Sequence, residues 1–420
     1  MREIPVESPE ATSLDNGLRV MAVRRPSAPV VGTILLYGAG SIRDPESLSG
    51  LAHLSEHMMF RGSERYPDGA VDELTNRLGG ANNAVTTNDY AAYYFVFPRE
   101  TWSTALDIEA DRMSGCLMDR LAFETERSIA VEERQMLDDE PDAVVDEAVE
   151  GMAFASHPYG LPVVGVLEDL ERATLEDVRG FYETWYTPGN AVLAVAGDVD
   201  PAEVLDEAAA RFSGSAGRAP TSGGGEPGAE PEQTEPRAAR LRCDGGIARM
   251  SIGYRCPPVS GDDSPAVDLV SAILGTGRSS RLYRRLVAGD GDVNDVSVDR
   301  MLQRHPGLMI VSAELSQEGD LRACESAILK EIAGLARDGP TPDELERAKS
   351  LWRLDRSMGR ESSLGMAGYL AFWEFVGGWD SGQAYEKRVS AATAGDVARA
   401  ARVYMDPEAR NSVWMAPATK

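Results

Sequence analysis

Residues 51–60 read LAHLSEHMMF, and the rest of the chain is organised around this stretch. It places two of the four histidines of the chain, His53 and His57, on one short helical segment, with Glu56 between them. Residues four apart on an α-helix lie one above the other, so both imidazoles can bind a single metal ion. Glu56 follows His53 by three positions and therefore lies beside the same ion. The stretch predicts a metal centre with a carboxylate next to it.

The spacing is that of the inverted zinc-hydrolase motif H-x-x-E-H, in which two histidines bind Zn²⁺ and the glutamate is the general base. The alternative is a pair of structural histidines in a core. Chance would produce about 0.006 such patterns in a chain of this composition and length. A metal site is therefore favoured over two structural histidines. A mononuclear zinc site needs a third protein ligand, and the acidic helix expected at 123–139 and the turn after it offer several candidates. The pattern alone does not choose among Glu124, Glu126, Glu132, Glu133 and Glu140.

Composition limits the class of protein. The 42 basic and 68 acidic residues give a net charge of −26, which argues against nucleic acid or an anionic membrane surface as a partner. The four cysteines have no C-x-x-C spacing, so they indicate neither a disulfide framework nor a zinc knuckle. The N-terminal residues lack an apolar signal segment, and no apolar run approaches the roughly 18 residues of a membrane span. We expect a cytoplasmic protein, or a periplasmic one if a signal peptide has been removed.

Local patterns predict the elements around the motif. Strands are expected at 18–23 and 30–37, forming a hairpin, and at 90–97, where aromatic and β-branched residues indicate a buried strand. Helices are expected at 68–78, 100–118 and 123–139.

The chain also contains a weak internal repeat. Thr174-x-x-Asp177-Val178 recurs as Thr393-x-x-Asp396-Val397, and Pro188 recurs as Pro407 at the same offset. Residues 213–237 are rich in Gly, Pro and Glu, which is typical of a linker. We therefore expect an α+β protein of two homologous domains related by duplication, each an antiparallel sheet flanked by helices. The zinc-binding domain would span 1–212, and the domain without metal would span 238–420.

The motif and its flanks resemble the pitrilysin family of zinc metallopeptidases, in the branch that includes the mitochondrial processing peptidases and their bacterial relatives. The resemblance runs over nearly the whole chain. It rests on the segments Gly50-Leu51-Ala52-His53 to Phe60-x-Gly62-Ser63, Gly79-Gly80-x-x-Asn83-Ala84-x-Thr86, the acidic helix, His157-Pro158-Tyr159-Gly160 and Ser279-Ser280-Arg281-Leu282.

The family pattern E-x₆-E falls on Glu126 and Glu133. The resemblance therefore implies Glu133 as the third zinc ligand and Glu126 as a carboxylate that serves catalysis by orienting a ligand. It also implies that Asn83 and Ala84 contact the backbone of a substrate held in extended form along an edge strand. The alternative to substrate contact is that Asn83 is only a turn residue before a strand.

One departure from the family pattern concerns the second half. The resemblance implies an Arg and, seven residues later, a Tyr after the Ser-Ser-Arg-Leu segment, but Val287 and Asn294 stand there. We expect a zinc-dependent endopeptidase that cleaves peptides or unfolded segments, with one Zn²⁺ per chain. It would be the zinc-bearing subunit of a heterodimer whose homologous partner supplies the Arg and Tyr. The alternatives are a non-catalytic assembly subunit of the same family and a metal-storage protein, against which Glu56 argues.

Overall fold

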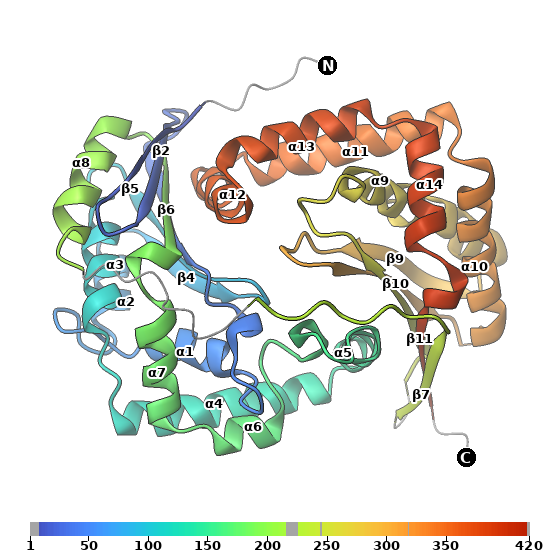
Figure 1. Cartoon of the computed structure of the whole chain (residues 1–420), viewed down its shortest axis with the longest axis horizontal. Helices are drawn as coiled ribbons and strands as arrows, with labels where there is room; N and C mark the ends of the chain where they lie inside the picture. The colour runs from blue at the N-terminus through green and yellow to red at the C-terminus, as the bar shows by residue number, and fades with distance from the viewer. Residues whose placement is uncertain (1–7, 216–225, 244–245, 318, 418–420) are drawn as a thin grey trace. The chain divides into compact units, whose positions relative to one another are not determined.

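The computed structural model describes residues 8–215, 226–243, 246–317 and 319–417. Residues 1–7 and residues 216–225 of the linker expected at 213–237 lie outside the described ranges. The chain divides into two compact units. Unit 1 comprises 1–135, 162–227 and 357–383, and unit 2 comprises 136–161, 228–356 and 384–420. Each unit combines one sheet with helices, so the expected α+β class with two similar halves is confirmed (Figure 1).

Unit 1 contains a six-stranded sheet in the order β1-β2-β6-β3-β5-β4. The strands are β1 (Glu10–Ser13), β2 (Arg19–Arg24), β3 (Val30–Tyr37), β4 (Ala81–Thr86), β5 (Ala91–Pro98) and β6 (Ala191–Gly197). The expected hairpin of residues 18–23 and 30–37 is wrong, because β6 lies between β2 and β3. Every residue of β6 is buried, as a continuous apolar run requires of a central strand.

Unit 2 contains a five-stranded sheet in the order β7-β11-β8-β10-β9. The strands are β7 (Arg237–Cys243), β8 (Arg249–Cys256), β9 (Val293–Arg300), β10 (Gly307–Leu315) and β11 (Asn411–Pro417). This order repeats that of unit 1 without β1. Both sheets are mainly antiparallel, as expected, and each has one parallel pair that we did not expect, β2 with β6 and β7 with β11.

The α-helices from the first half of the chain are α1 (Leu51–Met59), α2 (Ala70–Arg77), α3 (Thr104–Gly115), α4 (Arg120–Asp138), α5 (Pro141–Ala153), α6 (Leu167–Arg172), α7 (Leu175–Trp185) and α8 (Pro201–Phe212). Those from the second half are α9 (Ser264–Gly275), α10 (Leu321–Asp338), α11 (Pro342–Gly359), α12 (Ser363–Val376), α13 (Trp379–Ala391) and α14 (Ala394–Tyr404), with a π-helix at Tyr283–Asp290. None of the helices described is long and apolar enough to cross a membrane.

One helix from each half of the sequence packs in the unit formed mainly by the other half. α12 packs against β3 and β6 of unit 1, and α5 packs against β8 and β11 of unit 2 (Figure 1). A Cβ on Gly32 of β3 would lie 2.5 Å from the backbone of Leu364 in α12. A Cβ on Gly253 of the equivalent strand β8 would lie 2.2 Å from Val149 in α5. The absence of a side chain at each glycine therefore makes room for the helix that packs there. Because of these two helices, neither unit is one of the continuous segments 1–212 and 238–420 that we expected.

The repeated sequence pattern forms the same local structure in both units. Thr174 and Asp177 form a capping box at the start of α7, and Thr393 and Asp396 form one at the start of α14. Each box satisfies backbone donors at a helix N-terminus, where the helix itself offers no acceptor.

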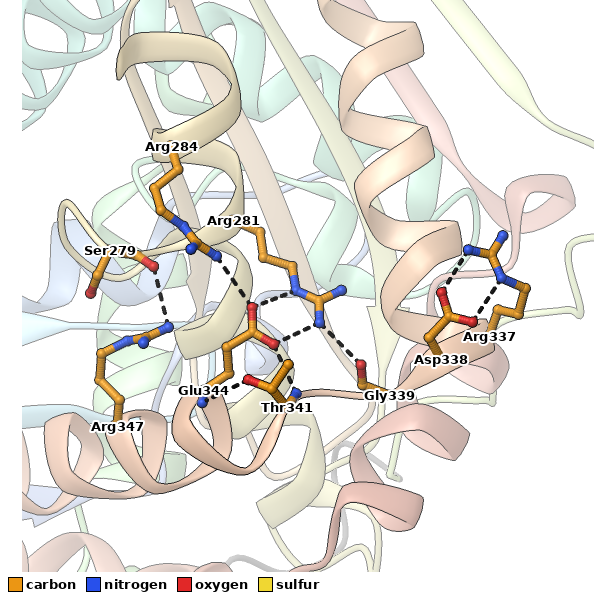
Figure 2. A network of polar contacts seen from close by, with 9 residues as sticks. All are labelled: Ser279, Arg281, Arg284, Arg337, Asp338, Gly339, Thr341, Glu344 and Arg347. Carbon is orange, nitrogen blue, oxygen red and sulfur yellow. Dashed lines mark hydrogen bonds and ion pairs between the residues drawn. The ribbon is translucent and has the colours of Figure 1, made fainter. Parts of the chain in front are cut away.

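In unit 2, Glu344 joins the start of α11 to the Ser-Ser-Arg-Leu segment (Figure 2). Its carboxylate accepts hydrogen bonds from Arg281 at 2.9 and 2.8 Å and from the Thr341 N–H at 2.9 Å. The Glu344 N–H in turn donates to the Thr341 hydroxyl at 3.2 Å, which completes a capping box. Arg281 therefore has a structural role in this unit.

Candidate metal centre

The helix α1 carries the motif, and Gly50, the residue before its first turn, has φ +89°. The carboxylate of Asp44 accepts hydrogen bonds from the N–H groups of Gly50 and Ala52, each at 2.7 Å. These bonds satisfy donors in the first turn of the helix. One face of α1 is buried in the core of unit 1 and consists of Leu51, Ala52, Leu54, Met58 and Met59. Helical periodicity leaves His53, Glu56 and His57 half-buried on the other face.

Glu133 of α4 faces the two histidines. Its Oε2 lies 3.7 Å from Nε2 of His53 and 3.5 Å from Nε2 of His57. The three ligand atoms lie within 4.8 Å of one another, and they form the one such group of three or more among the described residues. The structure thus brings together the two motif histidines and the glutamate that the family pattern indicated.

These three residues fit a zinc ion. Bonds of about 2.0–2.1 Å in a tetrahedral site place ligand atoms roughly 3.3 Å apart, close to the 3.7 and 3.5 Å between Glu133 and the two histidines. Burial lowers the pKa of His53 to about 4, and the imidazole of His57 acts in the same direction. His53 is therefore neutral at pH 7, as a metal ligand must be.

Glu126 lies behind His57, two turns before Glu133 on α4. Its Oε2 accepts a hydrogen bond from Nδ1 of His57 at 2.9 Å. Its Oε1 is held by the guanidinium of Arg61, two residues after the end of α1. Glu126 is buried and reaches the ligand His57 with its carboxylate, so its place is that of an orienting carboxylate.

Glu56 is held by β4. The hydroxyl of Thr86 donates a hydrogen bond to Oε2 of Glu56 at 2.5 Å. Burial raises the pKa of Glu56 above that of an ordinary glutamate, whereas the Thr86 bond acts in the opposite direction. A carboxylate with a raised pKa is a stronger base than an exposed one.

The residues expected to contact substrate lie on β4, which is an edge strand of its sheet. Asn83 is exposed and Ala84 is half-buried. The side-chain oxygen of Asn83 accepts a hydrogen bond from the N–H of Ala84 at 2.9 Å. Asn83 is thus within a strand and is not a turn residue.

The two residues that depart from the family pattern lie in unit 2. Val287 belongs to the π-helix, and Asn294 belongs to β9. The amide of Asn294 donates to Oε1 of Glu314 and to the carbonyl of Leu315, each at 3.1 Å. Asn294 therefore serves local sheet structure.

Sequence reasoning missed Arg61 and Thr86. Both lie inside the segments that carry the family resemblance, Phe60-x-Gly62-Ser63 and Asn83-Ala84-x-Thr86. Their partners lie on different elements, so only the fold reveals the contacts.

Two family models match adjacent parts of the chain. The model described as Insulinase (Peptidase family M16) matches residues 19–166. The model described as Peptidase M16 inactive domain matches residues 172–351.

Curated relatives include named zinc proteases. The chain is 26% identical over 411 residues to the zinc protease PqqE of Helicobacter pylori, covering 97% of this chain and 93% of that protein. It is 25% identical over 348 residues to the uncharacterized zinc protease YmxG of Bacillus subtilis, covering 83% of each. It is 27% identical over 266 residues to a probable mitochondrial-processing peptidase subunit beta of Arabidopsis thaliana, covering 63% of this chain and 50% of that protein.

Solved structures agree with the fold. A protease from Helicobacter pylori matches with a TM-score of 0.93 at 25% identity, covering 98% of this chain and 100% of that one. A peptidase M16 inactive domain from Pseudomonas fluorescens matches with a TM-score of 0.87 at 18% identity, covering 98% of each chain, and shows the shared fold alone.

Proposed function

Because the chain belongs to peptidase family M16, we propose that it is a zinc-dependent endopeptidase whose metal is held by His53, His57 and Glu133. The observation that carries the proposal is the convergence of both Nε2 atoms on Oε2 of Glu133, at 3.7 and 3.5 Å. The naming of relatives as zinc proteases supports the same metal and the same reaction class.

When bound, the ion would polarise the scissile carbonyl and lower the pKa of a water molecule at its open position. Glu56 would accept the proton of that water and pass it to the leaving amine. Glu126 would hold the proton on Nδ1 of His57, which leaves Nε2 as the ligand atom. The open edge of β4 near Asn83 and Ala84 would pair with an extended peptide, because main-chain hydrogen bonds hold a chain without regard to its sequence.

The test is a metal and activity assay on the purified chain. We expect about one zinc per chain by plasma emission, and cleavage of an unstructured peptide. Glu56→Gln preserves the shape of the side chain but removes the base, so this variant should keep zinc and lose hydrolysis. A chain without zinc would favour the alternative of a non-catalytic assembly subunit. Cleavage by Glu56→Gln at the wild-type rate would place the general base elsewhere.

Within the family, we propose that the chain acts with a homologous partner, as in the branch of the mitochondrial processing peptidases. The resemblance implies an Arg and a Tyr at the positions of Val287 and Asn294. Val287 has no polar group, and the amide of Asn294 already donates to Glu314 and to the Leu315 carbonyl, so neither residue is available to stabilise a developing oxyanion. A homodimer would repeat the deficit, since both copies would carry the same Val and Asn. A partner that lacks H-x-x-E-H and carries the Arg and Tyr would complete the site.

A further inference from the structure

The contact between Thr86 and Glu56 joins two elements of unit 1. Thr86 is the last residue of β4, and Glu56 lies in the middle of α1. The distance of 2.5 Å between the hydroxyl oxygen and Oε2 falls in the range of charge-assisted O–H···O⁻ bonds. Both side chains are half-buried, so water competes weakly for this bond.

The hairpin between β4 and β5 fixes the position of Thr86. Thr86 pairs with Ala91 in the ladder. The next residue, Thr87, closes the turn: its N–H donates to the carbonyl of Tyr90 at 2.8 Å. Its hydroxyl also accepts hydrogen bonds from the N–H groups of Asp89 and Tyr90, at 3.2 and 3.1 Å. A β-branched side chain on such a backbone has few χ1 rotamers, so the Thr86 hydroxyl is held in place.

The backbone of Thr86 faces the open edge of the sheet. The N–H of Thr87 points toward β5, and the direction of the backbone groups alternates along an antiparallel strand. The N–H groups of Ala84 and Thr86 therefore point away from β5. The hydrogen bond from the Ala84 N–H to its neighbour Asn83 agrees with this direction, because that group is not used in the ladder. Thr86 thus presents its backbone N–H at the open edge of the sheet, while its side chain donates a hydrogen bond to Glu56.

We infer that Thr86 is a positioning residue that holds Glu56 in register with a peptide paired to β4. Its hydroxyl occupies Oε2 of Glu56 and leaves Oε1 to accept a proton. Because the same residue belongs to the edge strand, the distance between base and bound peptide is set by one stiff side chain. This inference rests on the proposed peptidase function and adds to it a coupling between base and substrate strand.

The test compares Thr86→Val, which keeps the shape and loses the hydroxyl, with Thr86→Ser, which keeps the hydroxyl. The full chain is assayed on an unstructured peptide, together with any partner that its activity requires. We expect Thr86→Val to lower kcat by about 10- to 100-fold, because a displaced base is poorly aligned. KM should stay within about twofold of wild type, because the backbone edge is retained. Thr86→Ser should recover most of kcat.

The control is Thr125→Val on α4, where an exposed hydroxyl donates to the carbonyl of Leu121. It should match wild type in kcat and KM. Three outcomes would overturn the inference: wild-type kcat in Thr86→Val, failure of Thr86→Ser to recover kcat, or loss of zinc from Thr86→Val.

Crystal structures of the wild type and the two Thr86 variants give a readout that needs no activity. We expect one Glu56 rotamer in the wild type and in Thr86→Ser, and a different rotamer or several in Thr86→Val. If the wild type cleaves no peptide, the proposed function fails, while this pattern of rotamers would still support the positioning role. The same Glu56 rotamer in all three structures would overturn it.

Discussion

Glu126 accepts a hydrogen bond from Nδ1 of His57 at 2.9 Å, and the ring nitrogen on the other side of that imidazole faces Glu133 at 3.5 Å. The carboxylate fixes which nitrogen carries the proton, so Nε2 presents its lone pair toward Glu133. Arg61 holds the second oxygen of Glu126 and keeps the carboxylate facing the ring. The buried carboxylate therefore prepares one metal ligand before any metal arrives.

Replacing Glu126 with Gln should weaken zinc binding by about 10- to 100-fold without changing the fold, because the orienting carboxylate loses its charge. Competition with a chromophoric chelator measures the affinity. Glu124→Gln on the same helix is the matched control, since Glu124 pairs with Arg127 and does not reach a histidine. Equal zinc affinity in the two variants would contradict the orienting role.

Replacing Glu133 with Ala should remove most of the zinc from the purified chain, because it deletes a ligand. Glu132→Ala is the control, since the neighbouring side chain is exposed and points about 100° away around the helix. Plasma emission measures zinc in both proteins. If both retain the same amount, Glu133 is not a ligand.

The sequence alone predicted the part of the site that lies on one helix. His53, Glu56 and His57 follow from helical periodicity, because their relative positions depend on α1 alone. The choice of Glu133 among the acidic residues of α4 needed the family resemblance, since periodicity relates residues of one helix and says nothing of the helix opposite. Thr86 and Arg61 were missed for the same reason.

Strand existence was predicted better than strand order. Residues 18–23 and 30–37 form strands near the expected places, but β6, more than 150 residues later, lies between them. One local feature of the sequence is related to the packing of α5 and α12 in the unit formed mainly by the other half of the chain. Gly32 and Gly253 lie in buried strands where larger residues pack better, and each admits a helix from the other half of the chain.

Glu344→Gln should lower the stability of unit 2 by roughly 2 kcal/mol at pH 7, because it removes a charge that Arg281 binds with two hydrogen bonds. Urea unfolding followed by a probe in this unit measures the change. Asp338→Asn is the control, because its pair with Arg337 lies in the same region but is fully exposed (Figure 2). A similar loss in both variants would show that the Arg281 pair adds nothing specific.

The pair of Arg281 and Glu344 also predicts that the stability of unit 2 depends on pH in the acid range. Hydrogen bonds from Arg281 lower the pKa of Glu344 from 4.5 to about 2. A folded-state pKa below the unfolded one gives stability that is present above pH 4.5 and is lost as the pH falls toward about 2. Wild type should therefore lose more stability than Glu344→Gln between pH 5 and about 2. Parallel losses in the two proteins would exclude Glu344 as a source of the acid sensitivity.

The isolated chain, loaded with zinc and shown to be folded, should cleave unstructured peptides poorly, because Val287 and Asn294 replace the Arg and Tyr that the resemblance implies. Adding a homologous chain that carries this pair and lacks H-x-x-E-H should raise kcat/KM by about 100-fold or more, the scale expected when a missing oxyanion donor is restored. The control partner carries Ala in place of the Arg and the Tyr; it should still bind this chain and should restore no activity. Basic and neutral peptides are both needed as substrates, since the net charge of −26 favours cationic ligands. Robust turnover by the isolated chain would show that other residues of this chain replace the missing pair, and it would end the case for a required partner.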